Sequence, residues 1–383
     1  MKGAIIRRGK SSWRLKFDVG RAADGKRKIA YHTFRGIKKD AEAELVRLMN
    51  GANNGNYVDP SKLTTAQFLE QWDRDWASLN LSPKTIERYR ELVRIHIAPN
   101  IGTELVQKLR PVSLSTLYAK LQRDGRAKGG GLAPRTVGHI HRIMHRALGH
   151  AMQWGIVSRN VASVVEPPKV VPAEMEILSA DQVNATLRTL RGAAMYPIVL
   201  TAFSTGMRRG EILALRWRDV NLDAAKIQVE RSLEETKAGL RFKEPKTRHG
   251  RRNIALPSSL VAELRGHWRA QQELRLALGV GKAAPDDLVF CTPDGGPRKP
   301  NSITREWSRL TVAKKLPKVS FHALRHTHVS QLIASGMDVL TISRRIGHAS
   351  PTITLGVYGH LFKNTDNQAA LVIEAAFGHT LGE

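Results

Sequence analysis

The sequence predicts a multidomain, mainly α-helical protein with small β elements. The chain has 383 residues, more than a single hydrophobic core usually organises. Two segments rich in Gly, Asn or Pro, residues 51–60 and 164–178, interrupt the regular patterns and divide the chain into three parts. Apolar residues recur at helical spacing in the second and third parts, whereas short alternating runs occur in the first and third.

Residues 1–55 are expected to form a three-stranded sheet with one helix. Residues 12–20 and 27–34 are short alternating runs, and residues 38–50 have helical periodicity. The basic side chains at the front of this part are candidates for binding DNA: Arg7, Arg8, Lys10, Arg14 and Lys16. The alternative is a solvated basic sheet face without a ligand.

Residues 61–165 are expected to form an all-helical bundle. The four predicted helices span residues 64–79, 82–99, 110–124 and 133–155. In the second of these, Ser82 is the expected N-cap and Pro83 the first helical residue. The bundle is basic, so we expect it to clamp DNA, with Lys84, Arg88 and Arg135 as candidate contacts.

Residues 175–383 predict an α+β domain. Ser179 is the expected N-cap of its first helix, and residues 195–215 are apolar enough for a buried helix pair. Three short strands are expected at residues 226–232, 240–247 and 251–257, and mainly helical segments follow to the end.

The charge of the chain points to a polyanionic partner. The net charge is +27 and the isoelectric point is about 10.6. It is distributed along the whole chain, at +8 for residues 1–60, +9 for residues 61–170 and +10 for the remainder. A nucleic acid that touches every part of the protein explains this distribution, whereas the alternative is a basic surface that serves solubility only.

Several classes of protein are not expected. No apolar run of 18 residues and no signal peptide occurs, so we expect a cytoplasmic protein that does not contact a membrane. The single cysteine, Cys291, excludes an intramolecular disulfide. His322 and His326 have the spacing of a zinc site but lack its glutamate, so no metal and no cofactor are expected.

Two short motifs supply cations suited to phosphate chemistry. In "TGMRRGEIL", Glu211 follows Arg208 by three residues and can orient its guanidinium toward a phosphate. A surface Arg–Glu pair is the alternative. In "FKEPKTRHG", Lys246 lies in a turn between two predicted strands, where it could enter a DNA groove and protonate a leaving oxygen. It could equally be one lysine of a solvated loop.

Two further motifs supply histidines, an arginine and a nucleophile. In "SFHALRHTH", His322 and Arg325 are three residues apart on one helix face. In "RRIGHASPTITLGVYGH", Gly347 is the expected helix terminator, His348 follows it, and Tyr358 comes ten residues later. A tyrosine phenolate can attack a phosphodiester, and two arginines can neutralise the charge that develops on its oxygens. An aromatic ring in a segment with Gly356 and Gly359 is poorly suited to a core, so we expect a mobile phenol.

Taken together, these motifs resemble the tyrosine recombinase family, in particular the three-domain, lambda-integrase-like phage integrases. The resemblance is carried by T-G-M-R-R-G-E, P-K-T, H-A-L-R-H-T, I-G-H-A-S and Y-G-H, in this order over residues 175–365. Residues 61–165 resemble the family's helical, SAM-like core-binding domain in layout only, and residues 1–55 resemble its arm-binding domain. Residues 175–383 would then form the catalytic domain.

The resemblance implies a site-specific recombinase that integrates or excises a phage or other mobile element. Arg208 and Arg325 would clamp the scissile phosphate, Lys246 would act as general acid, and Glu211 would orient Arg208. His322 would hydrogen-bond the phosphate and assist proton transfer, and His348 would donate a further hydrogen bond. Tyr358 would form a 3′-phosphotyrosyl intermediate.

The family's partners are implied in the same way. They are double-stranded DNA at core and arm sites, a homotetramer on that DNA, a host DNA-bending factor and an excisionase, all acting at the bacterial nucleoid. Two alternatives stay open on the sequence, a type IB-like topoisomerase and a catalytically inactive DNA-binding regulator.

Overall fold

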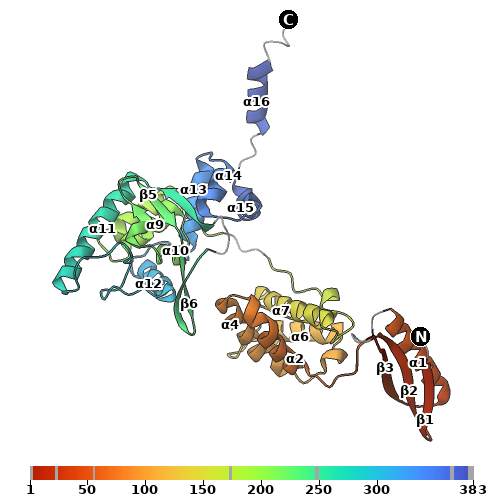
Figure 1. Cartoon of the computed structure of the whole chain (residues 1–383). Coiled ribbons are helices and arrows are strands. Elements are labelled where there is room, and N and C mark those ends of the chain that lie inside the picture. The colour runs from red at the N-terminus through yellow and green to blue at the C-terminus, as the bar shows by residue number, and fades with distance from the viewer. Residues whose placement is uncertain are drawn as a thin grey trace. The chain divides into compact units, whose positions relative to one another are not determined.

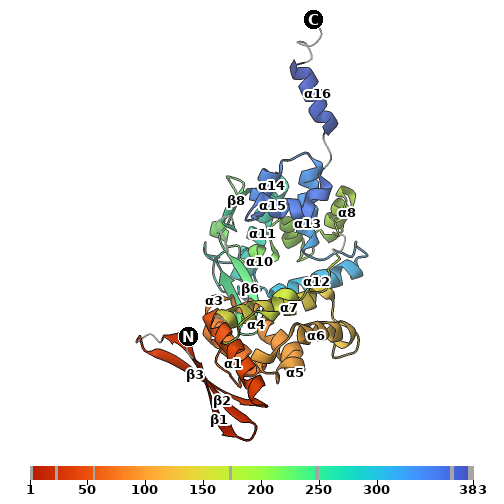
Figure 2. The same cartoon turned by 90° about the vertical axis from the view of Figure 1, so that its right-hand side faces the viewer.

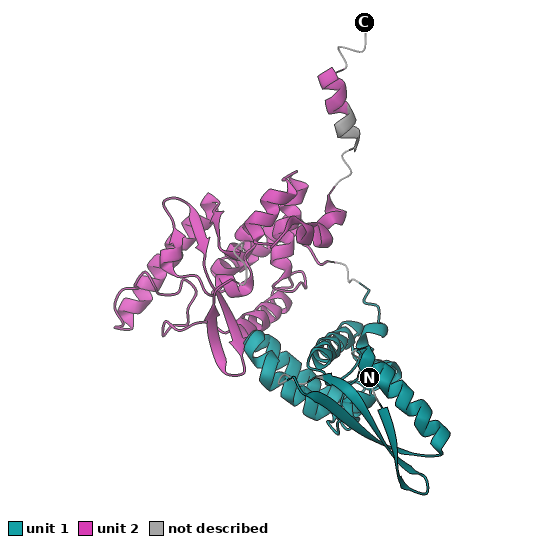
Figure 3. Ribbon diagram, turned by 45° about the vertical axis from the view of Figure 1, so that its right-hand side comes forward, with its two compact units in different colours: residues 1–172 teal, residues 173–383 magenta. Residues whose placement is uncertain are grey.

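The computed structural model describes residues 3–21, 25–54, 57–171, 175–245, 250–362 and 366–377. Contacts divide the chain into two units, Met1–Pro172 and Ala173–Glu383 (Figure 3). The division falls within the Pro-rich segment that the sequence predicts to be a linker. Each unit is considered by itself.

The first unit begins with a small antiparallel sheet covered by one helix. The strands β1 (Gly3–Gly9), β2 (Ser12–Arg21) and β3 (Arg27–Arg35) pair in sequence order, and α1 (Lys38–Asn53) packs on one face (Figure 1). Leu15 and Phe17 on β2 are fully buried toward α1, because alternate side chains of a strand point to the same face. The other face of the sheet carries Arg14, Lys16 and the exposed ring of Tyr31.

A helical bundle with its own hydrophobic core follows. Its principal helices are α2 (Thr65–Trp72), α4 (Pro83–Leu92), α6 (Pro111–Asp124) and α7 (Pro134–Gln153). Short helices α3 (Ser78–Asn80) and α5 (Ala98–Ile101) extend α2 and α4 through single π-helical turns. A proline occupies the first position of α4, α6 and α7, where its missing N–H costs no hydrogen bond.

Two predicted helix caps have different outcomes. Ser179 caps the helix α8 (Ala180–Leu190). Its hydroxyl accepts a hydrogen bond from the backbone N–H of Gln182, and the side-chain oxygen of Gln182 accepts one from the backbone N–H of Ser179. This prediction is confirmed. Ser82 occupies the N-cap position of α4 but makes no capping bond, because its hydroxyl is instead 2.9 Å from the Thr85 hydroxyl.

The second unit is built around α9 (Tyr196–Thr205), which is buried on nearly every side. It contacts α11 (Ser258–Ala277) and α13 (Ala323–Ala334), and α10 (Arg209–Ile212) follows it after a tight turn. The remaining helices are α12 (Pro300–Ala313), α14 (Val339–Ile346), α15 (Pro351–Tyr358) and α16 (Asp366–Phe377). None of the described helices has the length and apolar character needed to cross a membrane.

The second unit contains two small β structures. The strands β4 (Val220–Asn221), β5 (Lys226–Val229) and β8 (Arg252–Ala255) form one sheet, and β6 (Ser232–Thr236) pairs with β7 (Gly239–Lys243) in a hairpin. The sequence predicts one strand over 226–232, but the chain leaves β5 after Val229 and starts β6 at Ser232. Two consecutive acidic residues in β6 interrupt the alternation of apolar and polar residues that would predict a strand. In the structure one of them, Glu234, forms an ion pair with Lys243 of β7.

The helices α13, α14 and α15 lie side by side (Figure 2), and a second, smaller hydrophobic cluster joins them. Val329 and Ile333 of α13 pack against Ile342 and Ile346 of α14, and Tyr358 at the end of α15 completes the cluster. This packing fixes the C-terminal end of α15 against α13, the helix that carries Arg325.

Candidate active site

The site begins at the turn between α9 and α10. Gly206 ends α9 with φ 64°, a left-handed conformation that favours glycine. A side chain there would also meet the ring of His328 at 2.5 Å, so both the backbone and the available space require glycine. Because the chain reverses here, Arg208 becomes the N-cap residue of α10 and its side chain is held beside the turn.

A buried carboxylate orients Arg208. Glu211 is 4% exposed and accepts from Arg208 Nη1 at 2.8 Å and from Arg252 Nη2 at 2.9 Å. It also accepts the backbone N–H of Arg208 at 2.9 Å. Burial alone would raise the pKa of Glu211, but Arg252 and Arg208 outweigh burial and bring that pKa below its ordinary value. The carboxylate is therefore ionised at neutral pH.

Arg325 is a buried cation held by backbone carbonyls. Its side chain lies on α13, and the residue is 3% exposed. Nη1 donates to the carbonyl of Gly206 at 2.6 Å and Nη2 to that of Ile346 at 2.7 Å. No ion pair to Arg325 occurs among the described residues. Burial, together with nearby Arg208, lowers the pKa of Arg325 to about 9. An incoming anion would remove this electrostatic penalty.

Tyr358 is buried beside these arginines. The residue is 1% exposed, and its hydroxyl lies 2.7 Å from His326 Nδ1. Burial raises the pKa of Tyr358 to about 12, while Arg325 and Arg208 act in the opposite direction. The expectation that glycines would keep this ring out of a core is wrong. Gly356 lies within α15 and the φ of Gly359 is −54°, so neither glycine has a conformation that needs one.

His322 and His348 are uncharged groups near the arginines. His322 is the N-cap residue of α13, and its ring centroid lies 4.8 Å from that of His326. His348 follows Gly347 and shares a hydrogen bond of 2.9 Å between its Nδ1 and the Thr354 hydroxyl. Desolvation and then the neighbouring cationic groups lower the pKa of both His322 and His348 to about 4. Both imidazoles are neutral at pH 7 and can donate one hydrogen bond each.

The structure brings together five of the six predicted catalytic residues, together with Glu211. Gly347 links two of the motifs, because its carbonyl accepts from Arg208 Nη2 at 3.3 Å. The adjacent Arg209 donates instead to the hydroxyl of Thr304. Lys246, the sixth predicted residue, lies outside the described residues.

Two residues of this site are not identified by the sequence motifs. Arg252 shares Glu211 with Arg208, and its Nε donates to the carbonyl of Arg345 at 2.7 Å. The sequence indicates His326 only as a possible zinc ligand, yet it contacts the Tyr358 hydroxyl. Its position immediately after Arg325 was the available signal, but spacing alone does not reveal which side chain it meets.

The predicted DNA contacts of the first unit lie in two places. In the N-terminal sheet, Arg14 lies over the ring of Tyr31 on the uncovered face, whereas Arg7 lies over Trp13. Arg8 and Lys10 are exposed near the β1–β2 turn, and Lys16 lies opposite Tyr31 in the uncovered face.

In the bundle, Lys84 and Arg88 lie on α4 and Arg135 lies at the start of α7. Burial, followed by the charges of Arg142, Arg88 and Arg135, lowers the pKa of His139, so both predicted arginines act electrostatically on this histidine of α7.

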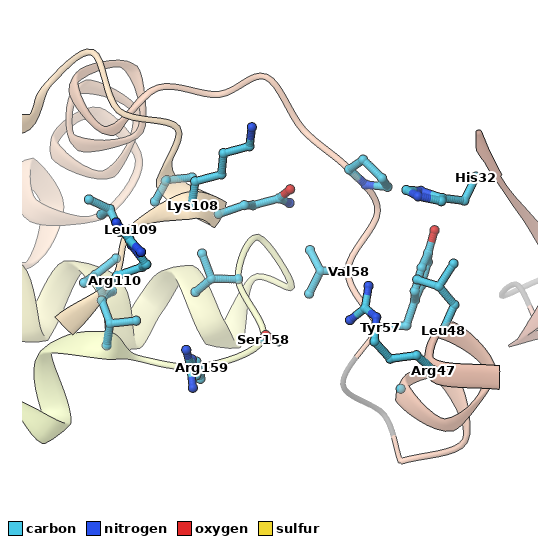
Figure 4. Close-up of a pocket in the computed structure, with 17 residues that line it drawn as sticks. His32, Arg47, Leu48, Tyr57, Val58, Lys108, Leu109, Arg110, Ser158 and Arg159 are labelled. Carbon is cyan, nitrogen blue, oxygen red and sulfur yellow. The ribbon is translucent and has the colours of Figure 1, made fainter. Parts of the chain in front are cut away.

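The first unit also has a basic cavity of about 560 Å³ (Figure 4). Its wall includes Tyr57 and Val58 of the segment after α1, and Arg47 of α1. The guanidinium of Arg47 donates a hydrogen bond to the carboxylate of Glu44. Lys108, Arg110 and Arg159 line the opposite side, and these three exposed cations form no ion pair among the described residues. They were not among the predicted DNA contacts.

The Arg208–Glu211–Arg252 group generates a prediction about stability. Glu211→Gln should lower the free energy of unfolding of the second unit by about 3 kcal/mol, because it leaves Arg252 buried without its carboxylate. The native pKa of Glu211 is lowered, so its contribution is complete above about pH 5 and is lost as pH falls through the native pKa. Urea unfolding at several pH values measures this. Glu273→Gln, at an exposed position of α11, is the matched control.

A stability difference below 0.5 kcal/mol between Glu211→Gln and Glu273→Gln at pH 7 would contradict the structural role assigned to this carboxylate.

Comparison with known proteins identifies the fold and the family. Residues 176–365 match the model of the phage integrase family. A "Tyrosine recombinase XerC-like" protein of Caldanaerobacter subterraneus subsp. tengcongensis is 24% identical over 98% of this chain and 99% of its own length. The Tn1549 transposon integrase, solved with transposon right end DNA, superposes with a TM-score of 0.67 at 21% identity, covering 82% of this chain and 99% of that chain.

The lambda integrase tetramer bound to a Holliday junction has a TM-score of 0.54 at 16% identity, over 91% of this chain and 96% of its own. These similarities confirm the predicted mainly α, multidomain fold class with small sheets. The chain belongs to the phage integrase family and is a tyrosine recombinase, an enzyme of site-specific DNA recombination.

Proposed function

We propose that the chain cuts and rejoins DNA through a covalent bond between Tyr358 and a 3′-phosphate. The observation that carries this proposal is the position of one buried phenol beside two arginines. Arg325 is buried without an ionic partner among the described residues, and both Arg325 and Arg208 act electrostatically on Tyr358. A phosphodiester seated between the guanidinium groups would supply the missing negative charge within reach of the phenol.

The arginines would stabilise the transition state. The non-bridging oxygens gain charge as the phenolate attacks phosphorus, and each guanidinium can donate to them from a position fixed in advance. Arg208 is oriented by Glu211, and Arg325 is oriented by the carbonyls of Gly206 and Ile346. His322 and His348, both neutral, would donate further hydrogen bonds to the same phosphate.

The leaving 5′-oxygen needs a proton, and Lys246 is the proposed donor. It occupies the segment between β7 and β8, where the P-K-T motif of the family is found. The cleaved strand then ends in a 5′-hydroxyl. A 5′-hydroxyl of another strand can attack the phosphotyrosyl bond, which restores the phenol and reseals DNA without an external energy source.

The three-part organisation is proposed to serve binding at two kinds of DNA site. Residues 61–165 would hold core DNA with Lys84, Arg88 and Arg135, and residues 175–383 would form the catalytic domain. Residues 1–55 would bind arm DNA through Arg7, Arg8, Lys10, Arg14 and Lys16. Lys108, Arg110 and Arg159, which line the basic cavity, would add backbone contacts between these sites.

The active assembly is proposed to be a homotetramer on two DNA duplexes, as in the lambda integrase complex with a Holliday junction. Integration or excision of a phage or other mobile element is the proposed outcome. A host DNA-bending factor and an excisionase would select between these directions, and the enzyme would act at the nucleoid. A type IB-like topoisomerase and an inactive regulator are not favoured by the family match.

The nucleophile can be tested directly. Tyr358→Phe removes one oxygen and keeps the ring that packs against α13 and α14, so folding and DNA affinity should be retained. Formation of a covalent protein–DNA adduct on a nicked suicide substrate should fall below detection, measured by denaturing gel electrophoresis. Tyr196→Phe, at the start of α9, is the matched control and should form adduct at the normal rate. Adduct formation by Tyr358→Phe would refute the proposal.

The role of the N-terminal sheet can be tested by deletion. Removing residues 1–55 should spare cleavage of a core site and lower the yield of integrative recombination by at least tenfold, because arm contacts are lost. The measurement compares adduct formation with recombinant product from paired attachment sites. Normal integration by the shortened protein would eliminate the arm-binding assignment.

A further inference from the structure

Arg325 is held by two peptide segments that lie far apart in the sequence. Its Nη1 donates to the carbonyl of Gly206, in the turn after α9, and its Nη2 donates to that of Ile346, the last residue of α14. A guanidinium is planar and rigid, so its direction depends on how these two carbonyls are placed relative to each other. Whatever fixes the end of α9 against the end of α14 therefore also aims Arg325.

A second arginine ties the same two segments together. Arg345 lies on α14, directly before Ile346. Its Nη2 donates to the carbonyl of Ser204, near the end of α9, at 3.0 Å. The same nitrogen donates to the carbonyl of Ala255 on β8 at 3.2 Å. One side chain therefore links the end of α14 to the end of α9 and to the small sheet.

His328 of α13 completes this link. Its Nδ1 lies 2.7 Å from the carbonyl of Phe203, so Nδ1 carries the proton and donates. Nε2 is then the unprotonated nitrogen, and it accepts from Arg345 Nε at 3.1 Å. The ring also lies against Gly206, where an added Cβ would come within 2.5 Å of it. His328 and Arg345 together thus contact three of the four residues 203–206, the segment that ends in the carbonyl bound by Arg325.

The backbone of Arg345 is tied to the group that orients Arg208. Its carbonyl accepts from Arg252 Nε at 2.7 Å, and Arg252 Nη2 donates to the carboxylate of Glu211 at 2.9 Å. Glu211 in turn binds Arg208. The last turn of α14 is thus connected to both arginines of the proposed phosphate clamp.

The charges at this link favour a positioning role over a stabilising one. Burial, and then the charge of Arg345, lower the pKa of His328 to about 4, so the imidazole is neutral at pH 7 and keeps its lone pair for Arg345. Burial, and then Arg252, lower the pKa of Arg345. No ion pair to Arg345 occurs in the part of the chain that the structure describes. A partly buried cation without a carboxylate is costly, and an apolar side chain would fill the position at lower electrostatic cost.

We propose that Arg345 is a positioning residue for Arg325. The inference rests on the proposed role of Arg325 in binding the scissile phosphate. Through its bonds to His328 and to the Ser204 carbonyl, Arg345 fixes the end of α9 against the end of α14. The two carbonyls that hold Arg325 are thereby set before DNA binds, so its guanidinium meets the phosphate without rearrangement. Such preorganisation lowers the barrier to the chemical step more than it strengthens binding.

Arg345→Met removes every donor of the side chain and keeps its length. Arg344→Met makes the same change at the exposed neighbouring position of α14 and is the matched control. At saturating DNA, the single-turnover rate constant of adduct formation should fall about tenfold or more in Arg345→Met and stay within about threefold of wild type in Arg344→Met. Gel shift should show unchanged DNA affinity in both. The rate constant is compared because partial unfolding lowers the yield of adduct but not the rate constant of the folded fraction.

A lysine substitution separates geometry from charge. Arg345→Lys keeps the positive charge, but one ammonium group cannot reproduce the planar fork that reaches His328 and two carbonyls at once. Its rate constant should therefore remain about tenfold below that of wild type. If Arg345 acted only through its charge, Arg345→Lys would react like wild type.

A double-mutant cycle tests whether Arg345 acts through Arg325. Arg325→Lys has no fork to bridge the two carbonyls, so their placement should no longer matter. Adding Arg345→Met to Arg325→Lys should then lower the rate constant by less than about threefold.

Three results would overturn the inference: Arg345→Met reacting within about threefold of wild type, Arg345→Lys reacting like wild type, or losses that multiply in full in the double variant. Arg325→Lys reacting like wild type would instead refute the phosphate contact of the proposed function itself.

Discussion

The burial of Arg325 without an ionic partner among the described residues is the constraint on which the site depends. Its guanidinium is tied to the carbonyls of Gly206 and Ile346, so one side chain joins the end of α9 to the end of α14. Carbonyl dipoles fix its direction but do not cancel its charge, and burial consequently lowers its pKa to about 9. The fold therefore buries a cation whose charge only an anion can fully offset, and this is the electrostatic basis of the proposed phosphate site.

The neighbouring groups follow from that constraint. The buried carboxylate of Glu211 pairs with both Arg208 and Arg252, so one negative charge offsets part of the positive charge concentrated here. The histidines stay neutral and add hydrogen bonds without adding repulsion. Tyr358 is brought into the same place by apolar packing of α13, α14 and α15, so its position is set by the core.

Much of this arrangement could be predicted from the sequence. Prolines and capping residues located the starts of several helices, and the order of short motifs identified Arg208, His322, Arg325, His348 and Tyr358. The sequence could not reveal partners that meet only in three dimensions. Arg252 reaches Glu211 from a strand 41 residues away, and His326 meets Tyr358 across 32 residues. The glycines near Tyr358 were misleading, because burial of the ring depends on α13 and α14. Lys246 and the DNA contacts remain predictions.

The central claim is that Tyr358 becomes bonded to DNA, and the attached residue can be identified directly. Adduct trapped on a suicide substrate can be digested with nuclease and trypsin and analysed by mass spectrometry. The account predicts a nucleotide remnant on the peptide of residues 346–363, localised by fragmentation to Tyr358, the only tyrosine in that peptide. A remnant on any other residue, or a wild-type protein that forms no adduct on a cognate site, would contradict it.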